Sequence, residues 1–158
     1  MSREGFYQLV CVILLVVFIG FSLSEEKEVT KSATEIAEEI AAVIDTENLT
    51  FFDEGRFEEE FGLDADTIES WAFIGSEDVM DVREILVIKL REGTDSKEII
   101  SAVEKRAEEK YNVYKDYDPV ASAVLQARVT ETNNGVIFYS AHENAREGAE
   151  VFIKSTQG

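Results

Sequence analysis

The hydrophobic pattern of the chain begins with one long apolar stretch. Residues 6–23 carry no charged side chain and end abruptly against Glu25, Glu26, Lys27 and Glu28. As a helix, a stretch of this length spans about 27 Å, slightly less than the ~30 Å hydrocarbon core of a bilayer. The pattern therefore predicts an N-terminal apolar helix within residues 1–24 that contacts a membrane through residues 6–23.

Two interpretations of this N-terminal segment remain open. An uncleaved anchor is favoured, because serine is a poorer cleavage residue than alanine. A secretory signal peptide is the alternative, since Arg3 precedes the apolar core, Gly20 can break a helix, and residues 22–24 read Ser-Leu-Ser, a small-x-small cleavage pattern that ends at Ser24. A short tail before a long domain is typical of exported domains, so we expect a single-pass cell-membrane protein with residues 25–158 outside the cytoplasm. Cleavage near Ser24 would give a secreted domain instead.

Behind a short polar stalk, residues 25–31, the pattern predicts one domain over residues 32–158. Apolar positions at three- and four-residue spacing predict helices over 32–45, over 97–110 and from Asn144 through Ile153, with Asn144 as a cap. Strands are predicted over 68–76, 84–90, 127–132 and 136–141. The strand over 84–90 is apolar on both faces, which indicates a central place in the sheet.

Turn chemistry separates these elements. Residues 133–135, Asn-Asn-Gly, favour the positive φ angles of a tight hairpin. Asp118 and Pro119 must stop or kink the preceding helix. That helix buries Ile99, Ile100, Val103 and Ala107 and leaves Arg106 among its solvated residues. The sum is an α+β fold with a mainly antiparallel, roughly four-stranded sheet packed with helices, preceded by one N-terminal apolar helix.

The net charge of the chain restricts which partners it can bind. The chain has 33 acidic and 15 basic residues, giving a formal net charge of -18. Nucleic acid is excluded as a partner, because a phosphate backbone requires clustered lysine and arginine. The same charge would repel anionic lipid head groups. Cys11 is the only cysteine and lies inside the apolar stretch, so the domain has no disulfide and Cys11 is misplaced for lipid attachment.

Candidate catalytic chemistry is sparse. His142 is the only histidine, and Ser140 shares its strand face, so a hydroxyl–imidazole contact could form with Glu143 or Asp116 as the orienting acid. The elbow sequence that usually carries such a serine is absent, and a surface or helix-capping histidine is the simpler interpretation. Paired carboxylates for glycoside hydrolysis can be drawn from the many acids, but no pair is distinguished.

The acidic residues also raise a calcium hypothesis. Candidate carboxylates occur in a turn and in the connection between the first two predicted strands: Asp64, Asp66, Glu77, Asp78 and Asp81. Their spacing matches no EF-hand loop, so a solvated acidic surface is favoured. Tyr111, Tyr114 and Tyr117 recur at a three-residue step, and this row either seals the core or lines a binding groove.

Several of these motifs together resemble a bacterial cell-envelope family described as domain of unknown function 4358, over about residues 33–154. The resemblance rests on the leading helix, the turn 61–64 before Trp71, the strand start Glu84–Ile85, the helix 97–110, the run Tyr117–Asp118–Pro119, and Asn134–Gly135 before residues 136–138. It implies a secreted or lipid-anchored envelope protein without an established activity. This chain lacks the lipid-attachment cysteine of many members.

These features lead to a functional hypothesis without assigned site residues. We expect a membrane-tethered or secreted extracytoplasmic domain that is not an enzyme and serves as a binding module of the bacterial cell envelope. Its partner would be an envelope protein or a wall component, and no catalytic, cofactor-binding or metal-ligating residue is assigned. The alternative is an envelope hydrolase that uses carboxylates or the Ser140/His142 pair.

Overall fold

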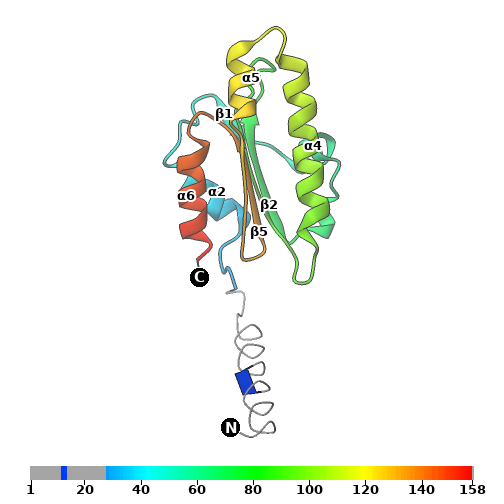
Figure 1. The fold of residues 1–158 in the computed structure, drawn as a ribbon, viewed down its shortest axis with the longest axis vertical. Coiled ribbons are helices and arrows are strands. Elements are labelled where there is room, and N and C mark those ends of the chain that lie inside the picture. Colours follow the sequence, from blue (N-terminus) through cyan, green and yellow to red (C-terminus); the bar gives the residue numbers. More distant parts are fainter. Residues whose placement is uncertain (1–11, 14–27, 158) are drawn as a thin grey trace, which may run out of the picture.

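The fold of the chain comes from a computed structural model that describes residues 12–13 and 28–157 (Figure 1). The predicted anchor or signal peptide over 1–24, its cleavage site and the start of the stalk therefore lie almost wholly outside the described residues. Within the described part of the chain, no helix has the length and apolar character needed to cross a membrane.

The centre of the domain is one antiparallel sheet of five strands in the order β1-β2-β3-β5-β4. The strands are β1 Leu49–Phe51, β2 Ser70–Ser76, β3 Glu84–Lys89, β4 Val129–Asn133 and β5 Val136–Ala141. The central place predicted for β3 is confirmed. The predicted count of four strands is wrong, because β1 was missed. It has three residues, too few to show a period of two.

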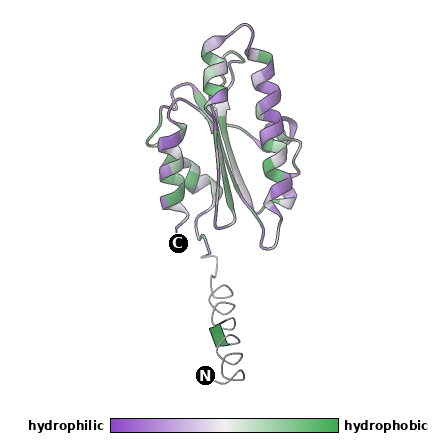
Figure 2. Ribbon diagram, viewed as in Figure 1, coloured by the Kyte–Doolittle hydropathy of each residue, from purple (hydrophilic) through white to green (hydrophobic). Residues whose placement is uncertain are grey.

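Helices cover both faces of the sheet and make a three-layer domain (Figure 1). One face carries α2 Ala33–Ala41 and α6 Ala145–Ser155. The other carries α3 Glu54–Phe61, the single 3-10 turn η1 Ala65–Thr67, α4 Ser96–Tyr114 and α5 Pro119–Gln126. Alternate residues of β3 enter the two cores, since Leu86 and Ile88 face α4 while Ile85 and Val87 face α2. Figure 2 shows the hydrophilic residues of α4 concentrated on its outer side.

Side chains at the helix starts explain most of the helix boundaries. Ser32 and Glu35 form a reciprocal capping box at the start of α2, and Asp95 caps α4. Asp118 accepts hydrogen bonds from the backbone of Val120 and Ala121. It therefore begins α5 with Pro119 in the first turn, a helix that the prediction omitted. The predicted stop before Pro119 is confirmed.

The hairpin between β4 and β5 has the predicted turn. Asn134 and Gly135 have φ angles of 47° and 74°, both positive. Asn133 and Asn134 also donate from their side chains to Thr156 at the end of α6, at 2.9 and 2.7 Å. Asn144, predicted to cap α6, makes no side-chain capping bond. Instead its own N–H donates to Nδ1 of His142, two residues earlier, at 2.9 Å.

Candidate functional site

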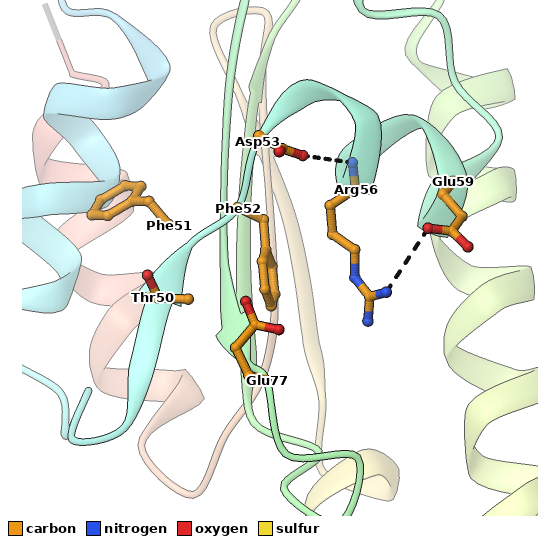
Figure 3. Close-up of a pocket in the computed structure, with 7 residues that line it drawn as sticks. All are labelled: Thr50, Phe51, Phe52, Asp53, Arg56, Glu59 and Glu77. Carbon is orange, nitrogen blue, oxygen red and sulfur yellow. Dashed lines mark hydrogen bonds and ion pairs between the residues drawn. The ribbon is translucent and has the colours of Figure 1, made fainter.

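Two surface hollows include residues of the β2–β3 connection, residues 77–83. The larger has a volume of about 440 Å³ and lies beside β1 at one edge of the sheet. Its lining comes from β1, the start of α3 and the end of β2: Thr50, Phe51, Phe52, Asp53, Arg56, Glu59 and Glu77. Figure 3 shows Phe52, Arg56 and Glu77 on one side of β1 and Phe51 on the other.

Arg56 is the one basic side chain in the larger hollow. Its guanidinium pairs with Glu60 at 2.9 Å and lies over the Phe52 ring at 5.4 Å, while Asp53 caps α3 through the Arg56 N–H. The Nε of Arg56 is buried and has no hydrogen-bond partner within the described part of the chain. Glu59 is 3.9 Å from the guanidinium. The cation is therefore already compensated by carboxylates, and the hollow offers no concentrated positive charge to an anionic ligand.

The smaller hollow, about 100 Å³, joins the β2–β3 connection to α5. Met80 and Val120 line it together with Asp118 and Glu143. Its basic residue, Arg83, is bound to Asp81 at 2.7 Å. The walls of this hollow are consequently apolar side chains with carboxylates around them.

Exposed apolar side chains gather beside the smaller hollow. We call Val79, Met80, Tyr117 and Val120 the distal patch; they are 76%, 53%, 57% and 73% exposed, respectively. The hydroxyl of Tyr114 donates to the carbonyl oxygen of Val79, which joins the β2–β3 connection to the end of α4. Met80 and Val120 line one hollow, Val79 directly precedes Met80, and the Tyr117 ring lies 5.4 Å from that of Tyr114, whose hydroxyl reaches Val79, so the four residues lie at the same end of the domain.

The tyrosine row divides between core and surface. Tyr114 is 8% exposed and packs in the core with the partly buried Tyr111, whereas Tyr117 is 57% exposed. The burial of Tyr114 raises the pKa of its phenol, Tyr117 adds to this effect, and Asp118 and Asp78 contribute after it. Both carboxylates therefore lie close to the aromatic pair.

A buried ion cluster lies next to this end of the sheet, at the start of β3. Glu84 is 2% exposed and receives Arg106 at 2.7 Å, Lys110 at 2.9 Å and the hydroxyl of Tyr139 at 2.9 Å. Arg106 also binds Glu60 through its Nε at 2.9 Å and lies over the Phe61 ring. The prediction that Arg106 is solvated is wrong, because its side chain is 12% exposed.

The sequence carries one signal for this cluster, the spacing of two basic residues. Arg106 and Lys110 are four residues apart on α4, so they point in the same direction from the helix, toward the first residue of the most apolar strand. Burial raises the pKa of Glu84, but the charges of Arg106 and Lys110 outweigh it and lower that pKa to about 2. The pKa of Tyr139 is raised by burial and then by Glu84. The cluster is an internally neutralised structural unit.

Acid should weaken the domain through Glu84. The pKa of Glu84 in the folded state is lower than its ordinary value of 4.5. Its contribution to the free energy of unfolding is therefore fully present above pH 4.5 and is lost as the pH falls toward about 2. We expect a loss of about 3 kcal/mol in the free energy of unfolding across this range. Urea unfolding of the full chain in mild detergent, followed by circular dichroism, measures it. The Glu84→Gln variant should lose less free energy of unfolding over the same pH range. An equal loss would show that Glu84 is not the group responsible.

Ser140 and His142 do not form a nucleophile–base pair in this structure. Ser140 is 0% exposed and donates to the backbone carbonyl of Glu84 at 3.0 Å. His142 is 2% exposed; its Nδ1 accepts from the Asn144 N–H at 2.9 Å, and its Nε2 lies 2.6 Å from the carbonyl oxygen of Asp45. These bonds require a proton on Nε2. The surface position expected for His142 is wrong, because the residue is buried; its ring accepts from the N–H of Asn144, the N-cap residue of α6, and ties the segment after α2 to the start of α6.

Three of the five carboxylates considered for calcium, where a solvated acidic surface is favoured, have other partners. Asp81 binds Arg83, Asp78 accepts from the Met80 N–H at 2.9 Å, and Asp64 accepts from the Asp66 N–H at 2.9 Å. Among residues 12–13 and 28–157, no group of three or more histidine, cysteine, aspartate or glutamate side chains is arranged to hold a metal ion. The acidic turns thus work locally as backbone caps.

Comparison with known families decides the classification. The family described as Domain of unknown function (DUF4358) matches residues 42–142, more than half of the chain. The chain belongs to this family. The resemblance found in the sequence is confirmed over a shorter range than expected, from the end of α2 to His142. No curated protein and no solved structure matches the chain. The DUF4358 match includes the β2–β3 connection, Glu84 and α5.

Proposed function

We propose that this DUF4358 domain is an extracytoplasmic binding module of the bacterial cell envelope, tethered to the membrane or secreted, and that it contacts its partner through the distal patch. The distal patch carries this proposal. Val79 and Val120 are each more than 70% exposed, in a domain whose other large apolar residues mostly lie in two cores. Clustered exposed apolar side chains mark binding surfaces in soluble domains.

The interior of the domain supports binding over catalysis. Glu84, Ser140 and His142 are the buried groups with the strongest potential for chemistry, and each is already bonded to neighbouring side chains or backbone. Neither hollow brings Ser140 and His142 together. These buried polar groups therefore have a structural role. The distal patch, in contrast, is apolar surface that the domain itself leaves uncovered.

The proposed tether agrees with where the patch lies. Residues 28–30 enter the domain beside the β4–β5 hairpin, at the end opposite α5 and the end of α4 (Figure 1). A domain held through its N-terminus would present the distal patch away from the bilayer. The apolar stretch over residues 6–23 supports the proposed tether, and the net charge of -18 disfavours contact between the domain and anionic lipid.

Cysteine labelling tests location and binding together. Because Cys11 is the only cysteine, a full chain with Cys11→Ser can carry a single reporter, either Val120→Cys in the distal patch or the control Glu38→Cys on the exposed side of α2. In intact bacteria, a membrane-impermeant maleimide should label both. In cells, Val120→Cys should react severalfold more slowly than it does in the purified chain, because the partner covers it. Glu38→Cys should react at the same rate in cells and in the purified chain.

Two outcomes would overturn the proposal separately. Labelling that appears only after lysis would remove the extracytoplasmic location. Labelling of Val120→Cys in cells at its purified rate would remove binding through the distal patch. N-terminal sequencing of the mature protein separates the two forms, because a chain that begins at Glu25 has lost its anchor.

A further inference from the structure

We infer that the distal patch binds a basic segment of a protein partner, in which lysine or arginine side chains alternate with apolar ones. This inference rests on the proposed binding function and specifies the chemistry of the partner. It follows from three observations about the patch: its apolar centre, its acidic rim and its exposed aromatic ring.

The apolar centre has no role in the fold. Val120 lies in the first turn of α5 and points outward, while Ala121, Val124 and Leu125 of the same helix are buried against the sheet. Val79 is held in place by its backbone, through the Tyr114 hydroxyl, and its side chain stays 76% exposed. Covering these two side chains removes apolar surface from water without rearranging the core.

Carboxylates surround this centre. The N–H of Asp118 donates to the carbonyl oxygen of Tyr114 at 2.9 Å, Asp118 lines the hollow with Val120, and the exposed Asp78 directly precedes Val79. Asp116 is exposed between Tyr114 and Tyr117 in the chain, and Glu143 lines the hollow beside Val120. The rim is therefore strongly negative.

The basic residues of this region offset the rim only in part. Arg83 is bound to Asp81 and reaches the carbonyl oxygen of Glu47, and Lys110 is bound to the buried Glu84. Lys115 donates to the neutral side-chain amide of Asn112 at 2.9 Å and keeps its charge, so it offsets one of the four carboxylates Asp78, Asp116, Asp118 and Glu143. The negative field beside the apolar centre thus favours a cationic partner, and it disfavours a second copy of this acidic chain or an anionic lipid surface.

Tyr117 gives the cation a defined place. Its ring is 57% exposed next to Asp116 and Asp118, so a guanidinium or ammonium group above the ring also lies near carboxylates. An apolar side chain of the same segment can then cover Val79 and Val120. A basic segment with apolar residues can both place a cation over Tyr117 and cover the valines. A purely apolar segment can only cover the valines, and an acidic segment can do neither.

A direct test uses a labelled synthetic peptide that alternates leucine with lysine, and a matched peptide that alternates leucine with glutamate. The full chain is placed in nanodiscs of zwitterionic lipid, and binding is measured by interferometry against empty nanodiscs. We expect the lysine peptide alone to bind. The double variant Val79→Ser/Val120→Ser should weaken binding about tenfold, as loss of a central apolar contact does. Val43→Ser, at a valine 49% exposed just after α2, should leave it unchanged.

A second pair of substitutions tests the rim. Asp78→Asn/Asp116→Asn keeps the side-chain oxygen of residue 78 that accepts from the Met80 N–H but removes two charges. Raising NaCl from about 0.05 to about 0.5 M should weaken binding to the native chain severalfold and affect this variant less. Equal salt dependence would remove the role of the rim and overturn the inference.

Other outcomes separate the possible failures. Equal binding of both peptides, no binding of the lysine peptide, or an equal effect of Val43→Ser would overturn the basic partner. So would sedimentation with phosphatidylglycerol vesicles that depends on Val79 and Val120, because it would assign the patch to lipid. If Val120→Cys is nevertheless protected in cells, the proposed binding function stands with a partner of different chemistry; if it is not protected, the proposed function itself fails.

Discussion

Replacing Arg106 by methionine is expected to remove about 3–5 kcal/mol from the free energy of unfolding, because it leaves the buried carboxylate of Glu84 without its closest cation. Lys110 and the Tyr139 hydroxyl would remain, but the two-pronged contact of the guanidinium, at 2.7 and 3.1 Å, would be lost. The same change removes one of the two basic partners of Glu60 and leaves Arg56 as the other. Urea unfolding of the full chain in mild detergent gives the value.

A neighbouring lysine supplies the control. The side chain of Lys105 is 77% exposed and 3.9 Å from Glu109, so Lys105→Met should change the free energy of unfolding by less than about 0.5 kcal/mol. The double variant Glu84→Gln/Arg106→Met should be more stable than the sum of the single changes predicts, since the Glu84 carboxylate is no longer present to be left without Arg106. If Arg106→Met and Lys105→Met have similar effects, the cluster does not stabilise the domain as the geometry implies.

Replacing Phe138 by alanine should cost about 3–5 kcal/mol in the free energy of unfolding, through the cavity it leaves under α2 and α6. The Phe138 ring is 0% exposed and stacks on Phe152 with the centroids 5.4 Å apart. It also lies where α6 comes closest to the sheet, because a Cβ at Gly148 would be 3.3 Å from the ring. The surrounding structure therefore has little freedom to fill the cavity.

Phe51→Ala tests whether burial causes this loss. Phe51 is 47% exposed at the edge of the sheet, so its truncation should cost less than about 1 kcal/mol in the same urea experiment. Tryptophan fluorescence adds a local check, since Trp71 stacks on Phe57 on the opposite face and should report no change in the native state of either variant. A Phe138→Ala domain as stable as Phe51→Ala would contradict the packing described for this core.

The sequence predicted those elements whose cause is local. The Asn134–Gly135 turn is encoded by residues that accept positive φ, and β3 was recognisable because both of its faces are apolar. The short strand β1 was not recognisable, because its pairing with β2 is made over only three residues and depends on the rest of the sheet. Helix α5 was omitted although Asp118 and Pro119 carry a common helix-start pattern.

The candidate site depended on contacts between distant segments. Glu84 and Arg106 are 22 residues apart, and their pairing is set by how α4 lies on the sheet. Val79 and Val120 are apolar residues of the kind that normally enter a core, and their exposure follows from the positions of the β2–β3 connection and α5. A sequence pattern records which side chains are apolar, but the packing of helices on the sheet decides which of them remain uncovered.

The two edges of the sheet have a consequence for crowding. An unpaired strand edge is a template on which another chain can add a strand, and this hazard grows when copies are concentrated on one surface. Here β1 offers only three residues at one edge, and β4 carries the exposed carboxylate of Glu131 at the other. Like-charged copies that meet edge to edge would bring these carboxylates together. Both features disfavour the addition of a further strand at the edges of this sheet.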